Sequence, residues 1–477
     1  MHIKTLFNEF FLATPPAASR IYNLSGSSAA LFLCLRREPF VAVEQAEDGA
    51  FQLSEDMEFF RMLGKGIIDQ PFSTFFLPEP NGPETSGKRA EVVSLIREED
   101  SLVASVRGIH SPVWSREDLK RGALLFVKGK EMNRETIGER LRALGYGRVS
   151  IVVEKGEYCM KGWLLDIFPS TTEYPVRIEF FGDEIEDMKT FDLDSQKSLG
   201  QIVNLAVLPA AEPVSGCEAA SLVSARQFFV DPAAEAGRDG LSEKLSSFGS
   251  PAVLSRFDFQ GEGFDAGLLS LRGCGIYPDE RESLADLVSA VSRLSGENQV
   301  IIVSPSKGQA ERVREILFDG GVVAPIIEIG EVADYQGRVV ITPGTLSSGL
   351  FMPGLLILTE KEIFGKRPSY RPLRKSRVSK LLTTIDDIAP GDLVVHKDHG
   401  IGKFIDILRQ KNEEEQDDLL VVEYMGGDRL YIPLYNINRI KKYSAEEGAL
   451  PQLDRLGGKS WQRTKERVRK AVKEMAE

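Results

Sequence analysis

The sequence predicts a multidomain protein that combines α/β with α+β domains. Its 477 residues are more than one hydrophobic core usually organises, so we expect roughly three to five domains of about 100 to 150 residues. Hydrophobic residues make up 42% of the chain and charged residues 27%, which is ordinary for globular domains. The pattern of apolar residues also changes several times along the chain, and each change marks a domain.

Residues 1–111 predict an α/β scaffold. Short apolar runs at Ala30–Leu35 and Leu102–Val106 are expected to be strands, and they alternate with expected helices at Ser54–Leu63 and Gly87–Arg97. Residues 210–282 contain much Ala, Ser and Gly and show poor periodicity. We assign them to a second part of the same scaffold, separated from the first part by an insertion.

Residues 112–209 predict this insertion, a compact α+β domain. One helix is expected at Arg134–Leu144, and strands separated by turns are expected at Arg148–Val153, Gly162–Phe168 and Val176–Phe181. The strands follow one another without intervening helices, which is the pattern of an α+β domain rather than of a parallel α/β sheet.

Residues 283–360 predict a smaller α/β domain with helices at Ser283–Leu294 and Gly308–Phe318. A small parallel sheet with crossover helices is expected from four apolar runs, Val300–Val303, Ile326–Ile329, Arg338–Ile341 and Leu355–Leu358. Residues 361–385 are expected to be an exposed basic linker, because residues 361–380 contain eight Lys or Arg and one acid.

Residues 386–443 predict a small β-barrel. Five short strands are separated by Gly, Asp and Asn turns: Leu393–Val395, Gly402–Leu408, Leu419–Tyr424, Arg429–Ile432 and Ile437–Ile440. Residues 444–477 predict a linker and a basic helix at Lys459–Met475, with Trp461, Val468 and Val472 near one face. No Gly or Pro stop signal ends this helix, so we expect the natural chain to continue.

Composition excludes several classes of protein. No apolar run approaches the roughly 20 residues that span a bilayer. We also expect no signal peptide at the N-terminus, and therefore a cytoplasmic protein without membrane contact. The four Cys residues show no CxxC spacing and there are only four His residues, so neither a metal site nor a disulfide framework is expected. The net charge of −12 argues against extensive DNA binding. Any DNA contact is expected to be local, through the basic linker or the C-terminal helix.

The segment Ser25–Ala30 follows an apolar run, where a phosphate loop would lie in an ATPase. A working loop needs Lys for the phosphates and Ser or Thr for magnesium, and these places hold Ala29 and Ala30. An ordinary Ser-rich turn is the alternative reading. Gly457–Ser460 also fails as a phosphate loop, because Leu453 stands where a Gly is required. We therefore expect no cofactor, no catalytic residues and no motor in this chain.

One group of motifs carries a specific resemblance: Gly145–Ser150, Glu154–Gly162, Leu165–Pro169 and Tyr174–Glu184. It resembles the inserted domain shared by the repair protein UvrB and the transcription-repair coupling factors, which docks on UvrA. The resemblance implies UvrA contacts at Lys161, Arg177 and Phe181, and it implies that the scaffold is a degenerate UvrB-like ATPase half. Relatives more often carry Arg at the position of Lys161, and Lys cannot make the planar bidentate pairs of Arg.

The residues of the third predicted strand support this site on independent grounds. In a strand, Arg177, Glu179 and Phe181 fall on one face, while Ile178 and Phe180 fall on the other. Phe181 is then an exposed apolar group beside a charge, as in a binding hot spot. The alternative is a strand that is buried on both faces, with Phe181 in the core.

A second group of motifs, Pro390–Phe404, Val422–Pro433 and Leu456–Trp461, resembles the RNA polymerase interacting domain of CarD-type regulators and coupling factors. The resemblance implies an SH3/Tudor-like barrel that pairs an edge strand with the β subunit of RNA polymerase. The implied contacts lie in the second strand and its following loop, at Ile407, Leu408, Arg409 and Gln410. Residues His396 and His399 lack further ligands at metal-binding spacing.

Together these resemblances predict an adaptor for transcription-coupled nucleotide excision repair, which binds stalled RNA polymerase and recruits UvrA. In the family, an ATP- and magnesium-dependent DNA translocase follows this region. Two alternatives stay open, a UvrB-like damage-binding protein and a CarD-like transcription regulator. The missing phosphate-loop Lys argues against the first, and the UvrB-like insertion argues against the second.

Overall fold

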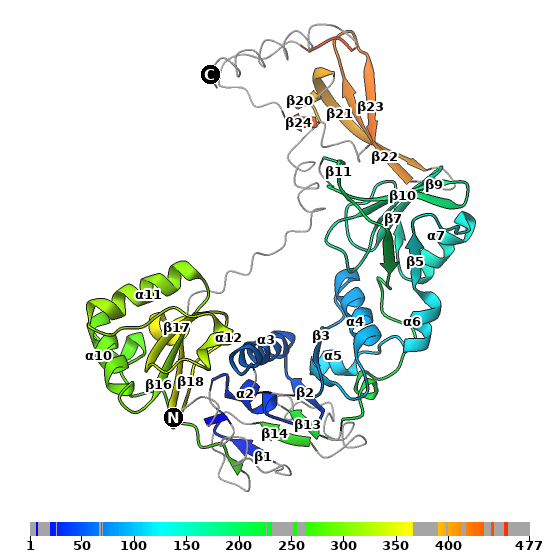
Figure 1. The fold of residues 1–477 in the computed structure, drawn as a ribbon. Helices are drawn as coiled ribbons and strands as arrows, with labels where there is room; N and C mark the ends of the chain where they lie inside the picture. The colour runs from blue at the N-terminus through cyan, green and yellow to red at the C-terminus, as the bar shows by residue number, and fades with distance from the viewer. Residues whose placement is uncertain are drawn as a thin grey trace. The chain divides into compact units, whose positions relative to one another are not determined.

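The structure is a computed structural model that describes residues 6–7, 20–24, 26–65, 68, 70–193, 195–225, 227–230, 251–254, 264–365, 390–396, 399–411, 416–433, 440–442 and 453–456. It has several separate sheets and is of mixed α/β class, as predicted (Figure 1). Contacts divide the chain into two compact units, Met1–Arg121 with Glu212–Tyr370, and Gly122–Ala211 with Arg371–Glu477. Among the described residues, no helix is both long and apolar enough to cross a membrane.

The scaffold is a seven-stranded parallel sheet with the strand order β15-β1-β14-β13-β2-β4-β3. Residues on both sides of the insertion contribute strands to it: β1 Arg20–Tyr22, β2 Phe40–Glu44, β3 Thr74–Leu77, β4 Ser101–Ser105, β13 Gln227–Val230, β14 Pro251–Leu254 and β15 Phe264–Asp265. Its helices are α2 Ser28–Cys34, α3 Glu47–Leu63, α4 Pro83–Leu95, α5 Val106–His110 and α6 Arg116–Gly122.

The predicted strand at Ala30–Leu35 is wrong, because these residues lie in helix α2 and its C-cap. A short apolar run does not distinguish a buried strand from a buried helix. Five of the six residues from Ala30 to Leu35 are buried. The helix is therefore apolar on all its faces, and its sequence lacks the 3.6-residue period of an amphipathic helix. The preceding strand is β1, and the Ser-rich segment joins the two.

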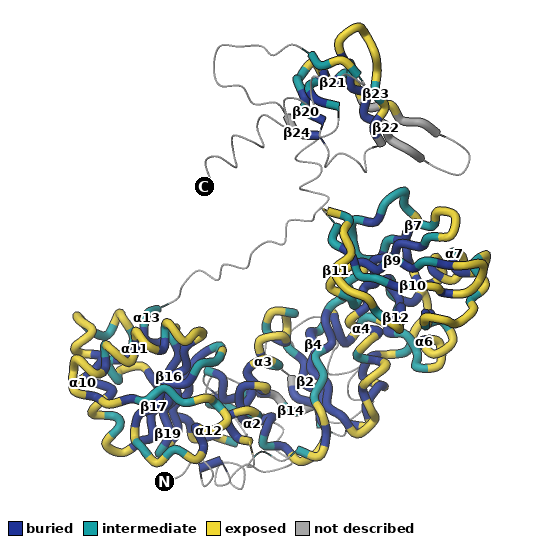
Figure 2. Tube along the Cα trace, turned by 45° about the horizontal axis from the view of Figure 1, so that its top comes forward, coloured by how far each residue is buried: buried dark blue, intermediate teal, exposed yellow. Residues whose placement is uncertain are grey.

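The small α/β domain has the strand order β17-β16-β19-β18, in which the first three strands are parallel and β18 is antiparallel to β19. Helices α10 and α11 lie on one side of this sheet, and the strands carry most of the buried residues (Figures 1 and 2). The elements are α10 Leu284–Leu294, β16 Gln299–Ser304, α11 Lys307–Asp319, α12 Ile329–Val332, β17 Val339–Pro343, β18 Leu350–Met352, β19 Leu355–Thr359 and α13 Glu360–Phe364.

Two predictions for this domain need correction. The expected strand at Ile326–Ile329 is only an isolated bridge from Ile326 to Ile341, and Ile329 already begins α12. The predicted linker from residue 361 begins too early, because α13 extends to Phe364 and buries Ile363. The Thr359 side chain caps this helix through a capping box, a local signal that a reading based on charge alone overlooks.

The inserted domain contains a six-stranded sheet with the order β11-β10-β9-β8-β7-β6 and a separate antiparallel pair of β5 with β12. Its elements are β5 Leu124–Val127, α7 Arg134–Ala143, β6 Gly147–Arg148, β7 Glu157–Lys161, β8 Leu164–Phe168, β9 Val176–Phe181, β10 Glu184–Phe191, β11 Ser198–Gln201 and β12 Asn204–Val207. The expected strand at Arg148–Val153 is wrong except at Arg148, because β6 has only two residues.

The described C-terminal residues form a five-stranded antiparallel sheet with the order β23-β22-β21-β20-β24. The strands are β20 Leu393–His396, β21 Gly400–Lys411, β22 Gln416–Glu423, β23 Arg429–Pro433 and β24 Ile440–Lys442. Strand β21 is longer than predicted and includes the residues expected to form a loop after Leu408. The predicted basic linker beyond residue 365 and the helix Lys459–Met475 lie outside the described residues.

A single buried side chain holds the two chain segments that connect the scaffold with the insertion. The Arg89 side chain is 1% exposed and donates hydrogen bonds to the carbonyl oxygens of Ser111 (3.0 Å) and Pro112 (3.2 Å), where the chain leaves the scaffold. It also donates to the carboxylate of Glu212 (3.2 Å), where the chain returns. Burial lowers the pKa of Arg89, and the charge of Glu212 opposes this effect.

The same two segments also pair with each other through their backbones, at Val113 and Cys217. Val113 and Cys217 form an antiparallel bridge in which each backbone N–H donates to the other residue's carbonyl at 3.0 Å. A side chain at Gly216 would collide with the Val113 carbonyl oxygen, since its Cβ would stand 2.3 Å away. The two connecting segments are therefore held together by a defined backbone bridge.

Candidate partner-docking sites

The six-stranded sheet of the inserted domain has one apolar and one polar face. On β9, Ile178 and Phe180 are buried against the domain core, while Arg177 and Glu179 are half-buried on the other face. Phe181 is 77% exposed. The predicted alternation along this strand is thus confirmed, and the alternative that places Phe181 in the core is wrong.

All three residues predicted to contact UvrA lie on the polar face. Asp166 pairs with Arg177 across β8 and β9, and with Cys159 across β7 and β8. Lys161 lies two residues after Cys159 and therefore points to the same side of the sheet. It is exposed. The structure brings Lys161, Arg177 and Phe181 to one surface, although it does not test whether they contact a partner.

Arg177 is engaged within the domain. Its Nε and one terminal nitrogen donate to the two carboxylate oxygens of Asp166 at 2.7 and 2.8 Å, and it also donates to Gln196 at 3.1 Å. Its guanidinium lies 4.7 Å from the ring centroid of Phe191. The hydrogen bond to Asp166 raises the pKa of Arg177. Arg177 is thus a fixed charge whose position is set by the sheet.

Neighbouring charges on this face pair with one another. The Nζ of Lys189 lies 3.3 Å from the Glu179 carboxylate and 2.8 Å from Asp187, and Lys128 also reaches Asp187 at 2.8 Å. Hydrogen bonds from Lys128 and Lys189 lower the pKa of Asp187 to about 2. The face therefore presents carboxylates as well as cations, and it is not a continuous basic patch.

Two residues that the sequence reasoning missed lie at one end of this sheet. Trp163, in the turn between β7 and β8, is 57% exposed. Arg134, at the start of α7, donates hydrogen bonds to the carbonyl oxygens of Gly162 and Gly182, which lie in the turns before β8 and after β9. The unusual Trp directly after a turn Gly is the sequence signal that could have drawn attention to this region.

The predicted RNA polymerase contacts lie on β21. Ile407, Leu408, Arg409 and Gln410 pair with Leu420, Leu419, Asp418 and Asp417 of β22. On its other side, β21 pairs with β20 only from Gly400 to Lys403 and contacts Asp392 at Phe404. Within the described part of the sheet, no strand covers that side from Asp406 onward. The Leu408 side chain is 46% exposed.

The two His residues of this sheet contact each other. The rings of His396 and His399 stack with centroids 4.7 Å apart, and the His399 backbone N–H donates to Nδ1 of His396 at 3.2 Å. Across the residues that the structure describes, no group of three or more His, Cys, Asp or Glu side chains is arranged to hold a metal ion. The pair fits a structural role in the β20–β21 turn.

The degenerate phosphate loop is covered by another loop. Gly26 has a φ of +64°, and a Cβ there would stand 1.9 Å from the carbonyl oxygen of Gly349. Asp56 of α3 accepts hydrogen bonds from the backbone N–H (2.8 Å) and the hydroxyl of Ser347. A small cavity of about 50 Å³ lies beside Ser27. The 344–349 loop of the small α/β domain thus covers Gly26 in the segment whose sequence we compare with a phosphate loop.

We expect the chain to bind no ATP, as measured by calorimetry with and without magnesium. Substituting the missing residue types through Ala29→Lys with Ala30→Thr should not create binding, because the 344–349 loop would still cover Gly26. Saturable binding of ATP at micromolar strength by the unmodified chain would contradict the expectation. Binding by the substituted chain alone would show that the side chains, and not the covering loop, prevent it.

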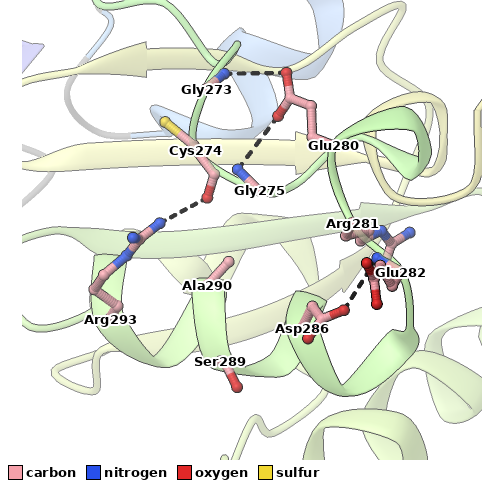
Figure 3. A pocket seen from close by; sticks show the side chains of 10 residues that line it. All are labelled: Gly273, Cys274, Gly275, Glu280, Arg281, Glu282, Asp286, Ser289, Ala290 and Arg293. Atoms are coloured by element: carbon pink, nitrogen blue, oxygen red, sulfur yellow. Dashed lines mark hydrogen bonds between the residues drawn. The ribbon is translucent and has the colours of Figure 1, made fainter.

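A pocket of about 590 Å³ lies where the segment before α10 meets that helix (Figure 3). Two of its charged side chains bond to the loop that lines it. Glu280 accepts hydrogen bonds from the N–H groups of Gly273 (3.0 Å) and Gly275 (3.2 Å), and Arg293 donates to the carbonyl of Cys274 (2.7 Å). These contacts stabilise a tight loop and do not converge on a common ligand position.

Two family models match the domains that contain the six-stranded and the five-stranded sheet. The family model described as the UvrB interaction domain matches residues 124–212, and the model described as the CarD-like/TRCF RID domain matches residues 388–444. The chain is similar to transcription-repair-coupling factors over most of its length. It is 24% identical to that of Myxococcus xanthus over 92% of this chain and 46% of the relative.

Two further relatives support the same assignment. The transcription-repair-coupling factor of Bacillus subtilis is 24% identical over 83% of this chain and 42% of its own length. That of Mycobacterium tuberculosis is 27% identical over 79% of this chain and 39% of its own length. The chain therefore spans less than half the length of the curated relatives it matches.

Proposed function

We propose that this chain is the adaptor portion of a transcription-repair-coupling factor, which binds stalled RNA polymerase and recruits UvrA. The main support for this proposal is that a single chain matches both the UvrB interaction domain and the CarD-like domain. The proposed partners act on the bacterial chromosome, so the proposed site of action is the cytoplasm. We propose that the ATP-driven translocation of the whole protein depends on a motor outside this chain.

The five-stranded sheet supports the polymerase half of the proposal. An SH3-like barrel is consistent with its short antiparallel strands and with its buried residues Val394, Phe404, Val422 and Ile432. Among the described residues no strand pairs with the side of β21 opposite β22 from Asp406 onward, and backbone hydrogen bonds along such an edge give affinity. We propose that the β subunit of RNA polymerase pairs there. Local DNA contacts by the basic linker or the C-terminal helix remain part of the proposal.

A bridging assay tests the adaptor function. Immobilised RNA polymerase should retain UvrA only when this chain is added, because the two proposed sites belong to different domains. If the chain binds each partner separately but never both together, it is not an adaptor. If it binds polymerase and never UvrA, it acts as a CarD-like regulator.

Replacing Leu408 with Glu should weaken polymerase binding by roughly tenfold or more, because a hot-spot side chain contributes about 1 to 2 kcal/mol and the new carboxylate must be desolvated at the interface. Surface plasmon resonance with the β subunit measures the effect. Met425→Glu is the matched control, since Met425 is 44% exposed in the β22–β23 turn of the same sheet. Equal affinities of the two variants would move the contact away from β21.

A further inference from the structure

The end of the inserted sheet at which β7 turns into β8 carries two exposed aromatic side chains. Trp163 is 57% exposed and Phe181 is 77% exposed. The backbone N–H of Phe180 donates to the carbonyl of Trp163 at 2.9 Å, so the two hairpin ends are hydrogen-bonded neighbours. Trp163 thus lies opposite Phe180, the residue before Phe181, so two exposed aromatic residues mark the same end of the sheet. Aromatic anchors supply much of the energy in protein complexes.

Arg134 holds both hairpin ends. One guanidinium donates to the carbonyl of Gly162 and, at 3.4 Å, to that of Gly182, and it lies 5.6 Å from the ring centroid of Phe180. The backbone N–H of Arg134 also donates to the Asp183 carboxylate at 3.3 Å. Both turn glycines have positive φ, +55° and +62°. The ends of the hairpins are thus fixed before a partner arrives, which lowers the entropy lost on binding.

We propose that Trp163 is a second aromatic anchor of the UvrA-docking site, beside Phe181, and that Arg134 is the positioning residue that holds both. This rests on the proposed function. Lys161 precedes the Trp163 turn and is exposed. The fitting partner surface has apolar hollows for the two rings.

A protein partner fits this surface better than a nucleic acid. Aromatic side chains can stack on bases, but the carboxylates of Asp166, Glu179 and Asp187 lie on the polar face of the same sheet. These carboxylates are paired with Arg177, Lys189 and Lys128, so the face carries no excess of positive charge. Phosphate contacts with cations supply most of the affinity in nonspecific nucleic-acid binding. The paired charges do not oppose a protein surface of mixed charge.

The test compares variants of the full chain in UvrA binding by surface plasmon resonance. Trp163→Ala should weaken binding about tenfold or more, and Trp163→Phe should retain most of it. Leu125→Ala is the matched control, because Leu125 is an exposed aliphatic residue (60%) on β5 of the same domain; it should change affinity less than twofold. Arg134→Ala should weaken binding less in the Trp163→Ala background than in the unmodified chain. It should also speed hydrogen exchange at the Phe180 amide.

The outcomes separate this inference from the proposed function. If Phe181→Ala loses UvrA binding while Trp163→Ala binds normally, the second anchor is wrong and the proposed function stands. If the unmodified chain does not bind UvrA, the proposed function itself fails. Binding of single-stranded DNA that depends on Trp163, without UvrA binding, would assign the surface to nucleic acid and overturn the inference. Unchanged exchange at Phe180 in Arg134→Ala would remove the positioning role.

Discussion

Replacing Arg89 with Met should destabilise the scaffold around the connection to the insertion by about 3 to 5 kcal/mol, because breaking a buried ion pair on one side leaves an uncompensated charge. The Glu212 carboxylate would lose its partner, and one of its oxygens is already buried without a hydrogen bond among the described residues. The carbonyl oxygens of Pro78, Gly108, Ser111 and Pro112 would also lose their donor. Hydrogen exchange at the Val113 and Cys217 amides measures the opening of this region.

Arg97→Met is the control for this prediction. The Arg97 side chain is 76% exposed and lies 3.9 Å from Glu99. Surface pairs of this kind contribute less than about 1 kcal/mol, so exchange at Val113 and Cys217 should not change. Arg89→Lys should resemble Arg89→Met, because one ammonium cannot reach oxygens on five residues. If Arg89→Met exchanges as slowly as the unmodified chain, Arg89 does not hold the connection.

Combining Arg177→Ala with Phe181→Ala should weaken UvrA binding by roughly a thousandfold. Each residue, as a hot spot, would contribute about 2 kcal/mol, and about 4 kcal/mol corresponds to that factor if the losses add. Phe181→Ala alone should therefore cost about thirtyfold. Calorimetric titration with UvrA gives both values, and circular dichroism verifies that the variants fold.

The internal pair of Arg177 with Asp166 requires its own control. Arg177→Ala leaves the Asp166 carboxylate, 11% exposed, without its bidentate partner, so part of any loss reflects the distortion of the sheet. Adding Asp166→Asn removes that charge. If Arg177→Ala with Asp166→Asn binds UvrA normally, Arg177 contributes through the fold and not through the interface.

Local patterns in the sequence predicted the helices and strands that show a clear hydrophobic period. The 3.6-residue period placed α7, α10 and α11 within one or two residues, and alternation along β9 placed Phe181 on the exposed face. The same approach failed at Ala30–Leu35, where burial on every side removes the period. Trp163 was missed because the sequence predicted it inside a strand at Gly162–Phe168, whereas it lies in the turn between β7 and β8.

The contacts that give the scaffold its specific form join residues far apart in the sequence. Ser347 bonds to Asp56 across 291 residues, and Arg89 bonds to Glu212 across 123. Neither pair lies in a local motif, and Arg89 resembles any other helical Arg in the sequence. The partners of Arg89 come together only when the surrounding chain segments have folded. No pattern in a single sequence therefore predicts these contacts.

The antiparallel pair β5–β12 has a consequence for the order of folding. Val113 and Cys217 are 104 residues apart in the sequence, and closing an unstructured loop of that length costs about 4 kcal/mol of chain entropy. A folded insertion already holds its own first and last strands together, with Leu124 opposite Val207. The folded insertion then shortens the effective loop between the two halves of the scaffold, and the entropy cost of bringing them together falls. The insertion is accordingly expected to fold first and to nucleate the sheet from which it departs.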